Sequence, residues 1–208
     1  DTVTLGSAIT SGTINLGSGT DALTLGAFAN TVTISNTEAI TGGTSDDVVT
    51  LGTAMIGTVN LGSGTDTLTL GDFANTVTVT GVETLVGGTS TDVVTLGSAI
   101  TSGTLDLGAG TDRLTLGNFA NTVTLTNIET IVGGTSADVI TLSTALTGTV
   151  NLGSGTDSLT LGDFANSLTV TSIETLVGGT SSDVIPLGSA VTSGTLDLGS
   201  GSDTLTLG

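Results

Sequence analysis

Aspartate is the residue type whose spacing in this chain could support chemistry. Ten Asp side chains open short alternating stretches at intervals that recur along the whole sequence. Crowded carboxylates can bind Ca²⁺, accept hydrogen bonds from backbone N–H groups of turns, or retain a proton. The ten candidate metal-ligating residues are Asp1, Asp21, Asp47, Asp66, Asp92, Asp112, Asp138, Asp157, Asp183 and Asp203.

The composition excludes most other chemistry. The 208 residues contain 19 Asp and Glu side chains, a single basic side chain, Arg113, and no Cys, His, Tyr or Trp, which gives a formal net charge of −18. Thiol, Ser-His and Lys-based nucleophiles and Cys or His zinc sites are therefore excluded, and we expect no enzyme in these residues. Nucleic acid is excluded as a partner because phosphate contacts need Lys and Arg, and no apolar run is long enough for membrane insertion.

Internal repetition governs the whole chain. The phrase GTDxLTLG, with GSD in its last copy, recurs five times at steps of 45, 46, 45 and 46 residues, and a second phrase, GGTSxDV, recurs four times between its copies. The unit length alternates because ITSGT (100–104) becomes the shorter MIGT (55–58), so the superrepeat has 91 residues. We interpret residues 1–208 as a single repeat region. It begins without Met and stops in mid-pattern, as expected for a fragment of a longer protein.

The alternation of side chains predicts strands. Stretches such as Asp66–Leu70 (DTLTL) and Thr76–Thr80 (TVTVT) alternate aliphatic residues with Thr, which places the aliphatic side chains inward and Thr outward. Glycine clusters mark turns, and no segment has a helical period. These features predict an all-β fold, a parallel β-solenoid resembling a β-roll, with about nine coils of alternating 19–20 and 26 residues that stack at roughly 4.8 Å.

If each coil begins at one of the ten Asp residues, these carboxylates line a single edge of a rod. Neighbours about 4.8 Å apart would then repel by roughly 3 to 4 kcal/mol at an effective dielectric of 20. Three other residue types recur at fixed phase, and we expect structural stacks of each. They are Phe28, Phe73, Phe119 and Phe164; Asn30, Asn75, Asn121 and Asn166; and Glu38, Glu83, Glu129 and Glu174.

Two phrases resemble a known family. LGSGTDTLT (61–69) and GGTSTDVVT (87–95) are similar to the nonapeptide G-G-x-G-x-D-x-U-x of the repeats-in-toxin proteins, and VETLVGGTSTDVVTLG (82–97) resembles the lead-in that often precedes it. This resemblance implies a β-roll whose turns bind several Ca²⁺ ions, secretion from a bacterium, and folding on contact with extracellular calcium. It also implies a role in surface layers, adhesins or the tails of secreted toxins and hydrolases.

The phrases depart from that motif in a regular way. The first has Leu in place of the first Gly, and the second has Ser in place of the third Gly. Two alternatives therefore stay open for the Asp edge. Either Ca²⁺ lies between successive Asp turns, or the edge is free of cations and each Asp caps its own turn.

Near-identical repeats favour a structural protein, because an active site would make one copy different from the others. We expect an extracellular scaffold at a bacterial cell surface, such as a surface layer, filament or adhesin rod, with end-to-end or lateral self-association. One alternative is an ice- or crystal-surface-binding solenoid that uses its outward Thr ranks. Another is the non-catalytic repeat tail of a secreted enzyme or toxin.

Overall fold

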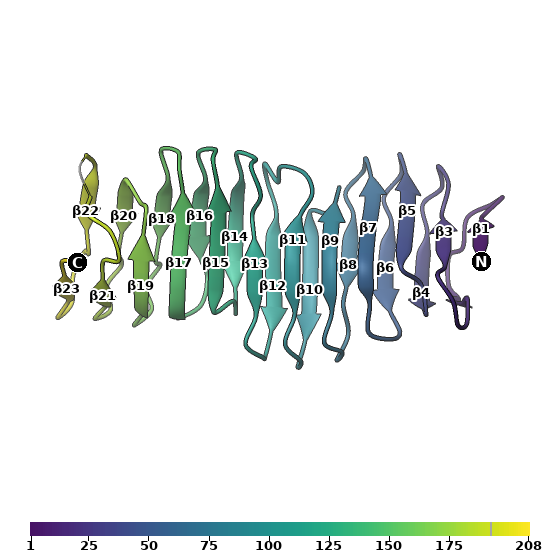
Figure 1. The fold of residues 1–208 in the computed structure, drawn as a ribbon, viewed down its shortest axis with the longest axis horizontal. Coiled ribbons are helices and arrows are strands. Elements are labelled where there is room, and N and C mark those ends of the chain that lie inside the picture. Colours follow the sequence, from purple (N-terminus) through teal and green to yellow (C-terminus); the bar gives the residue numbers. More distant parts are fainter. Residues whose placement is uncertain (192) are drawn as a thin grey trace. The chain divides into compact units, whose positions relative to one another are not determined.

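The computed structural model describes residues 1–191 and 193–208, and in these residues it contains strands and turns but no helix. The described part accordingly has no helix suited to crossing a membrane. The predicted fold class is confirmed: the chain is an all-β parallel β-solenoid of about 11 turns. Each turn supplies one odd-numbered and one even-numbered strand (Figure 1).

The odd-numbered strands form one sheet, called here the odd sheet, and the even-numbered strands form the even sheet. The odd strands are β1 (Thr2–Thr4), β3 (Ala22–Thr24), β5 (Ala39–Gly43), β7 (Ile56–Gly62), β9 (Thr76–Thr80), β11 (Val93–Leu96), β13 (Arg113–Thr115), β15 (Thr130–Gly134), β17 (Thr147–Gly153), β19 (Ser167–Thr171), β21 (Val184–Pro186) and β23 (Thr204–Thr206). The even strands are β2 (Thr13–Asn15), β4 (Thr31–Ser35), β6 (Val48–Leu51), β8 (Thr67–Thr69), β10 (Thr84–Gly88), β12 (Thr104–Gly108), β14 (Thr122–Thr126), β16 (Val139–Leu142), β18 (Ser158–Thr160), β20 (Thr175–Val177) and β22 (Thr195–Asp197).

The chain divides into two compact units. The first comprises residues 1–98 and 105–110, and the second comprises residues 99–104 and 111–208. In the first unit the odd sheet has the order β1-β3-β5-β7-β9-β11, and in the second it has the order β13-β15-β17-β19-β21-β23. The even strands follow the same progression, so each unit is built by winding the chain in one direction.

The register shows how the sequence repeat relates to the winding. In the even sheet of the first unit, Thr13 pairs with Thr33, Val48 pairs with Thr67, and Thr67 pairs with Thr84, so one turn takes 20, 19 or 17 residues. The 45- or 46-residue unit therefore contains five strands, which make two and a half turns. Because five is odd, successive copies of the same phrase begin in different sheets. A predicted 26-residue coil contains three strands, which is why the solenoid has more turns than the nine expected.

The core consists of aliphatic side chains that stack between turns. In the first unit Val49, Leu68 and Leu85 are paired in register in the even sheet, and each is 0 % exposed. The alternate residues are Thr on the outer face, as the alternation predicted, and they form columns such as Thr33, Thr50 and Thr69. Burial of the aliphatic rows removes apolar surface from water. Each Å² of buried apolar surface stabilises the fold by about 25 cal/mol, which favours stacking of each turn on the next.

Glycine allows the closest approach between turns at the end of β7. Gly62 has φ of +96°, and a Cβ atom added there would lie 2.1 Å from the carbonyl oxygen of Gly43 in the paired strand β5. Gly17 occupies the same place in the repeat, with φ of +90°, but a Cβ atom there would meet nothing within 4 Å. The two positions therefore separate the effect of a positive φ from the effect of contact between turns.

We expect Gly62→Ala to destabilise the protein far more than Gly17→Ala. Both variants force Ala into a left-handed conformation at a cost of about 1 to 2 kcal/mol. Only Gly62→Ala adds an overlap with a carbonyl oxygen, which costs about 1 to 3 kcal/mol more. The midpoint of urea unfolding, followed by circular dichroism, measures the difference. Equal midpoints for the two variants would show that the turns do not pack in this way.

Candidate functional site

The ten predicted Asp residues do not lie in a single file. The turns that lead into odd strands are called here the odd edge, and those that lead into even strands the even edge. In the first unit Asp1, Asp21 and Asp92 directly precede odd strands, whereas Asp47 and Asp66 directly precede even strands. In the second unit the odd edge carries Asp112, Asp183 and Asp203, and the even edge carries Asp138 and Asp157. The single-edge prediction was wrong because each repeat contains an odd number of strands.

Side chains at the even edge of the first unit form a ladder of caps for backbone N–H groups. The N–H of Ile9 donates to Oδ1 of Asn30 at 3.0 Å, and the N–H of Asn30 donates to Oδ1 of Asp47 at 2.9 Å. In the next steps the N–H of Asp47 donates to Oδ1 of Asp66 at 2.7 Å, and that of Asp66 donates to Oε2 of Glu83 at 2.9 Å. Each residue is thus capped by the side chain one turn further along.

The second unit repeats this ladder residue for residue. At its even edge the capped N–H groups belong to Ile100, Asn121, Asp138 and Asp157, and the last cap is Oε2 of Glu174. The odd edges use the same order, for instance from Leu146 to Asn166 to Asp183 to Asp203, with N–H to Oδ1 distances of 2.8 to 2.9 Å. At the first odd turn the amino terminus of Asp1 pairs with Oδ1 of Asp21.

Asn and Glu therefore belong to the same ladder as Asp, which sequence analysis missed. Asn30 also donates from Nδ2 to the carbonyl oxygen of Phe28 at 2.7 Å and to Oδ1 of Asp47 at 2.9 Å. The expected single stacks of Phe, Asn and Glu are not formed, because successive copies of each residue lie at opposite edges, as Phe28 before β4 and Phe73 before β9 do. A signal was present in the sequence: Asn30, Asp47, Asp66 and Glu83 are separated by 17, 19 and 17 residues, which are the lengths of single turns.

The ladder leaves one carboxylate oxygen of several Asp residues without a hydrogen bond. The Asp47 and Asp66 side chains are each 0 % exposed, they lie on successive turns, and the described structure gives their Oδ2 atoms no partner. The same holds for Oδ2 of Asp21, Asp138, Asp157 and Asp183. A buried charge without compensation is costly, and two such charges on adjacent turns repel each other.

Protonation is one physical answer to this crowding. Burial raises the pKa of Asp66 to about 6, against the opposing effect of the N–H donated by Asp47, and the charges of Glu83 and Asp47 raise it further. Burial also raises the pKa of Asp157 to about 6, where Asp138 and Glu174 act in the same direction. The pKa values of Asp92 and Asp138 are likewise raised by burial, although Asn side chains donate to both.

The ladder fits a calcium site only in part. Ca²⁺ takes six to eight oxygen ligands. The buried Oδ2 atoms without partners could supply some of them, but Oδ1 of the same residues already accepts a backbone N–H. Among the described residues no group of three or more acidic side chains is arranged to hold a metal ion. The hydrogen bonds of the ladder correct the capping alternative in one respect: each Asp caps the neighbouring turn, not its own.

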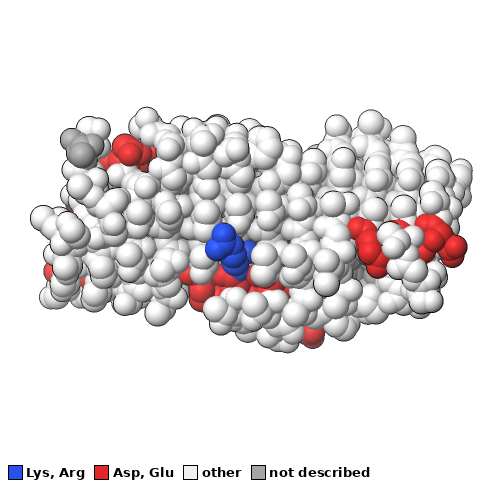
Figure 2. All heavy atoms as spheres, viewed as in Figure 1, with Lys and Arg blue, Asp and Glu red and all other residues white. Residues whose placement is uncertain are grey.

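Most charged side chains lie in the turns, although Arg113, the single basic residue, lies in β13. All acidic residues except Asp106 and Asp197 lie outside the strands. Figure 2 shows one side of the molecule, where acidic atoms gather in a few patches and most of the surface carries no charge. The sheet faces therefore offer hydroxyl and methyl groups in a chain that is strongly acidic as a whole.

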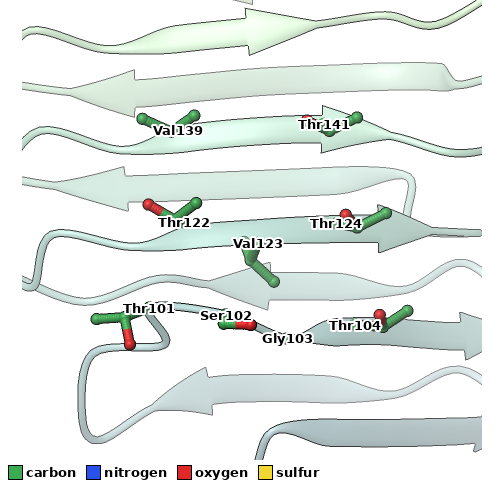
Figure 3. Close-up of a pocket in the computed structure, with 9 residues that line it drawn as sticks. All are labelled: Thr101, Ser102, Gly103, Thr104, Thr122, Val123, Thr124, Val139 and Thr141. Atoms are coloured by element: carbon green, nitrogen blue, oxygen red, sulfur yellow. The ribbon is translucent and has the colours of Figure 1, made fainter.

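A groove on the even sheet of the second unit is a feature that sequence analysis did not anticipate. It has a volume of about 390 Å³ and is lined by residues 101–104 and by outward residues of β14 and β16 (Figure 3). None of the ten predicted Asp residues lines it. The only signal was the extra residue of ITSGT compared with MIGT.

Comparison with known proteins adds no relative to this description. No protein-family model, no curated protein and no solved structure matches the chain. The arguments for function therefore come from the ladder, the groove and the composition. The ladder offers acceptors for backbone N–H groups and buried acids, but no nucleophile paired with a base.

We expect the protein to be more stable in mild acid than at neutral pH. A carboxyl group whose pKa is raised from 3.8 to about 6 binds its proton more tightly in the folded chain than in the unfolded chain. Its contribution to stability is complete below about pH 4 and is lost as the pH rises through about 6. Thermal melting in chelator from pH 4.5 to pH 8 should show a falling melting temperature.

The double variant Asp66→Asn and Asp157→Asn is the matched control. It keeps the Oδ1 acceptors for the N–H groups of Asp47 and Asp138 and removes the two titrating groups. Its melting temperature should vary less with pH than that of the native chain. A melting temperature of the native chain that rises from pH 5 to pH 8 would show that ionisation of these carboxyl groups does not destabilise the folded protein.

Proposed function

We propose that the chain is a non-catalytic structural repeat segment of an extracellular scaffold. The observation that carries this proposal is the regularity of the capping ladder. The ladder that runs from Ile9 to Glu83 in the first unit has the same residue types, in the same order, as the ladder from Ile100 to Glu174 in the second. Every step of both ladders is a hydrogen bond from a backbone N–H to a side-chain oxygen of the next turn. A scaffold preserves such symmetry, whereas a catalytic site breaks it.

The composition and the charge distribution support the same proposal. The chain has no Cys, His, Tyr or Trp, and its acids either cap backbone groups or lie at turns. The sheet faces, which carry few charged side chains, would allow copies to associate laterally, while the acidic edges would repel one another unless cations or salt screen them. The resemblance to repeats-in-toxin proteins supports a location at a bacterial cell surface, in a surface layer, filament or adhesin.

Calcium at the Asp edges remains a prediction of that resemblance. Its test is a calcium titration of the purified chain after chelation, followed by circular dichroism and by sedimentation velocity at pH 7.5. We expect calcium to raise the strand signal and to produce larger assemblies, because cations offset the repulsion between buried Asp pairs and between acidic edges.

Magnesium at the same ionic strength is the control, since it dehydrates reluctantly and demands octahedral geometry. A full strand signal in chelator that calcium does not change would remove calcium from the proposal. A chain that remains monomeric under every condition would contradict self-association.

The threonine columns favour a second candidate, binding to ice or another crystal surface. Thr13, Thr33, Thr50 and Thr69 are paired in register on the even sheet of the first unit, and Thr58, Thr78 and Thr95 form a column on the odd sheet. Rows about 4.8 Å apart present a regular hydroxyl grid. Freezing hysteresis of the purified chain above that of a buffer control would support this function, and its absence would contradict it.

A further inference from the structure

The groove on the even sheet is produced by one additional residue. In the shorter repeat, β7 and β17 are seven residues long and begin at Ile56 and Thr147, whose side chains lie exposed on the outer face of the sheet. In the longer repeat, β12 begins only at Thr104, and Thr101 and Ser102 form a bend, after which the carbonyl oxygen of Gly103 accepts a hydrogen bond from the N–H of Thr124 in β14. In the longer repeat, the position on the sheet that Ile56 or Thr147 occupies in the shorter repeats is therefore left without a strand residue.

The lining of the groove is rich in hydroxyl groups and free of charge. Thr101, Ser102 and Thr104 lie on one side, and outward residues of β14 and β16, including Thr124 and Thr141, lie on the other (Figure 3). Thr122 adds a sixth hydroxyl, and Val139 supplies apolar surface, whereas the Val123 side chain points into the core and is 3 % exposed. Each hydroxyl can both donate and accept a hydrogen bond.

The same groove recurs in the first unit. Its lining includes Ser11, Gly12, Thr31, Thr33 and Thr50, each of which lies 91 residues before its counterpart in the second unit, and its volume is about 150 Å³. The β2 strand starts at Thr13, as β12 starts at Thr104. Both of the longer repeats that the structure describes in full therefore form a groove at this place. The groove is thus a consequence of the inserted residue and not of a local irregularity.

We propose that these grooves bind neutral, polyhydroxylated ligands, namely uncharged saccharide chains. Hydroxyl groups that donate and accept match those of a sugar, and the methyl groups of Thr and Val match its C–H surfaces. The absence of lining charges, together with the net charge of −18, disfavours anionic ligands, and the lack of carboxylates in the groove disfavours cations. The groove of the second unit, with a volume of about 390 Å³, lies within the range of small-molecule sites, which begins at about 300 Å³, and the groove of the first unit, with about 150 Å³, is smaller.

This inference does not depend on the proposed scaffold function. A site made of hydroxyls, without an aromatic platform, binds a single saccharide weakly, and repeated copies along a chain raise the overall affinity for a polymer by multivalency. The groove of each repeat pair would then matter mainly for long ligands with repeating sugar units.

The test uses the shorter unit as a design for removing the groove. Deletion of Ser102 converts ITSGT into the length of MIGT, which the chain already folds at residues 55–58, and deletion of Ser11 does the same in the first unit. Saturation-transfer NMR with neutral tetrasaccharides, cellotetraose, maltotetraose and chitotetraose, measures binding. We expect the native chain to bind at least one of them, and the double deletion to lose more than about tenfold in affinity.

Three further variants make the result specific. Insertion of Ser between Thr147 and Gly148 should create a groove on the odd sheet and increase binding. The pair Thr124→Ala and Thr141→Ala should weaken binding. The pair Thr149→Ala and Thr169→Ala, which are paired in register on the odd sheet and line neither groove, should leave binding unchanged. Circular dichroism confirms that each variant keeps its strands.

Several outcomes would overturn the proposal. They are no binding of any neutral tetrasaccharide at about 10 mM, equal binding by the native chain and the folded double deletion, and preferential binding of an acidic oligosaccharide such as tetragalacturonate. The last outcome would point to a cation-bridged anion site at the turns instead.

Discussion

The structure depends on how the backbone N–H groups at its turns are satisfied. A parallel solenoid pairs the strands of successive turns, but the Asn and Asp residues just before many strands point their N–H groups toward the next turn, where a side chain and not a backbone carbonyl accepts them. The Glu residues before β5, β10 and β20 donate instead to a backbone carbonyl of the preceding turn. A buried N–H without a partner costs about 1 to 3 kcal/mol. In this chain an Asn, Asp or Glu oxygen from the next turn accepts that hydrogen, as Oδ1 of Asp66 does for Asp47. Such a cap is needed at almost every half-turn, so a repeating polar residue is a requirement of the fold.

This requirement explains where the acids lie and why they are not all charged alike. The caps must sit inside the corner of the solenoid, and therefore Asp47 and Asp66 are completely buried although no basic residue accompanies them. Burial raises the pKa of Asp66 to about 6, so this carboxyl group loses its proton at a higher pH than an exposed Asp does. The acids capping the turns leave the sheet faces almost free of charge, which suits contact with neutral surfaces, saccharides or other copies.

Small changes of length have large local effects in such a fold. One residue added to a turn does not shift the register of the strands, because the capping ladder and the aliphatic stacks on either side hold the register. The extra residue is instead accommodated in the bend at Thr101 and Ser102, and a groove forms beside Thr124 and Thr141. A chain of nearly identical repeats can in this way carry a recurring site without any change to its core.

The sequence by itself determined the local structure. Alternation of aliphatic residues with Thr specified strands and the face that each side chain takes, and glycine clusters specified the turns, because these depend only on neighbouring residues. The ten Asp residues were also correctly identified as opening the strands. Tertiary structure decided which edge each Asp reaches, since that depends on the number of strands per repeat, and five strands place Asp21 and Asp66 at opposite edges. It also decided the partners of those carboxylates, because the N–H group capped by each one comes from another turn, 17 to 20 residues away, and the winding alone brings the two together.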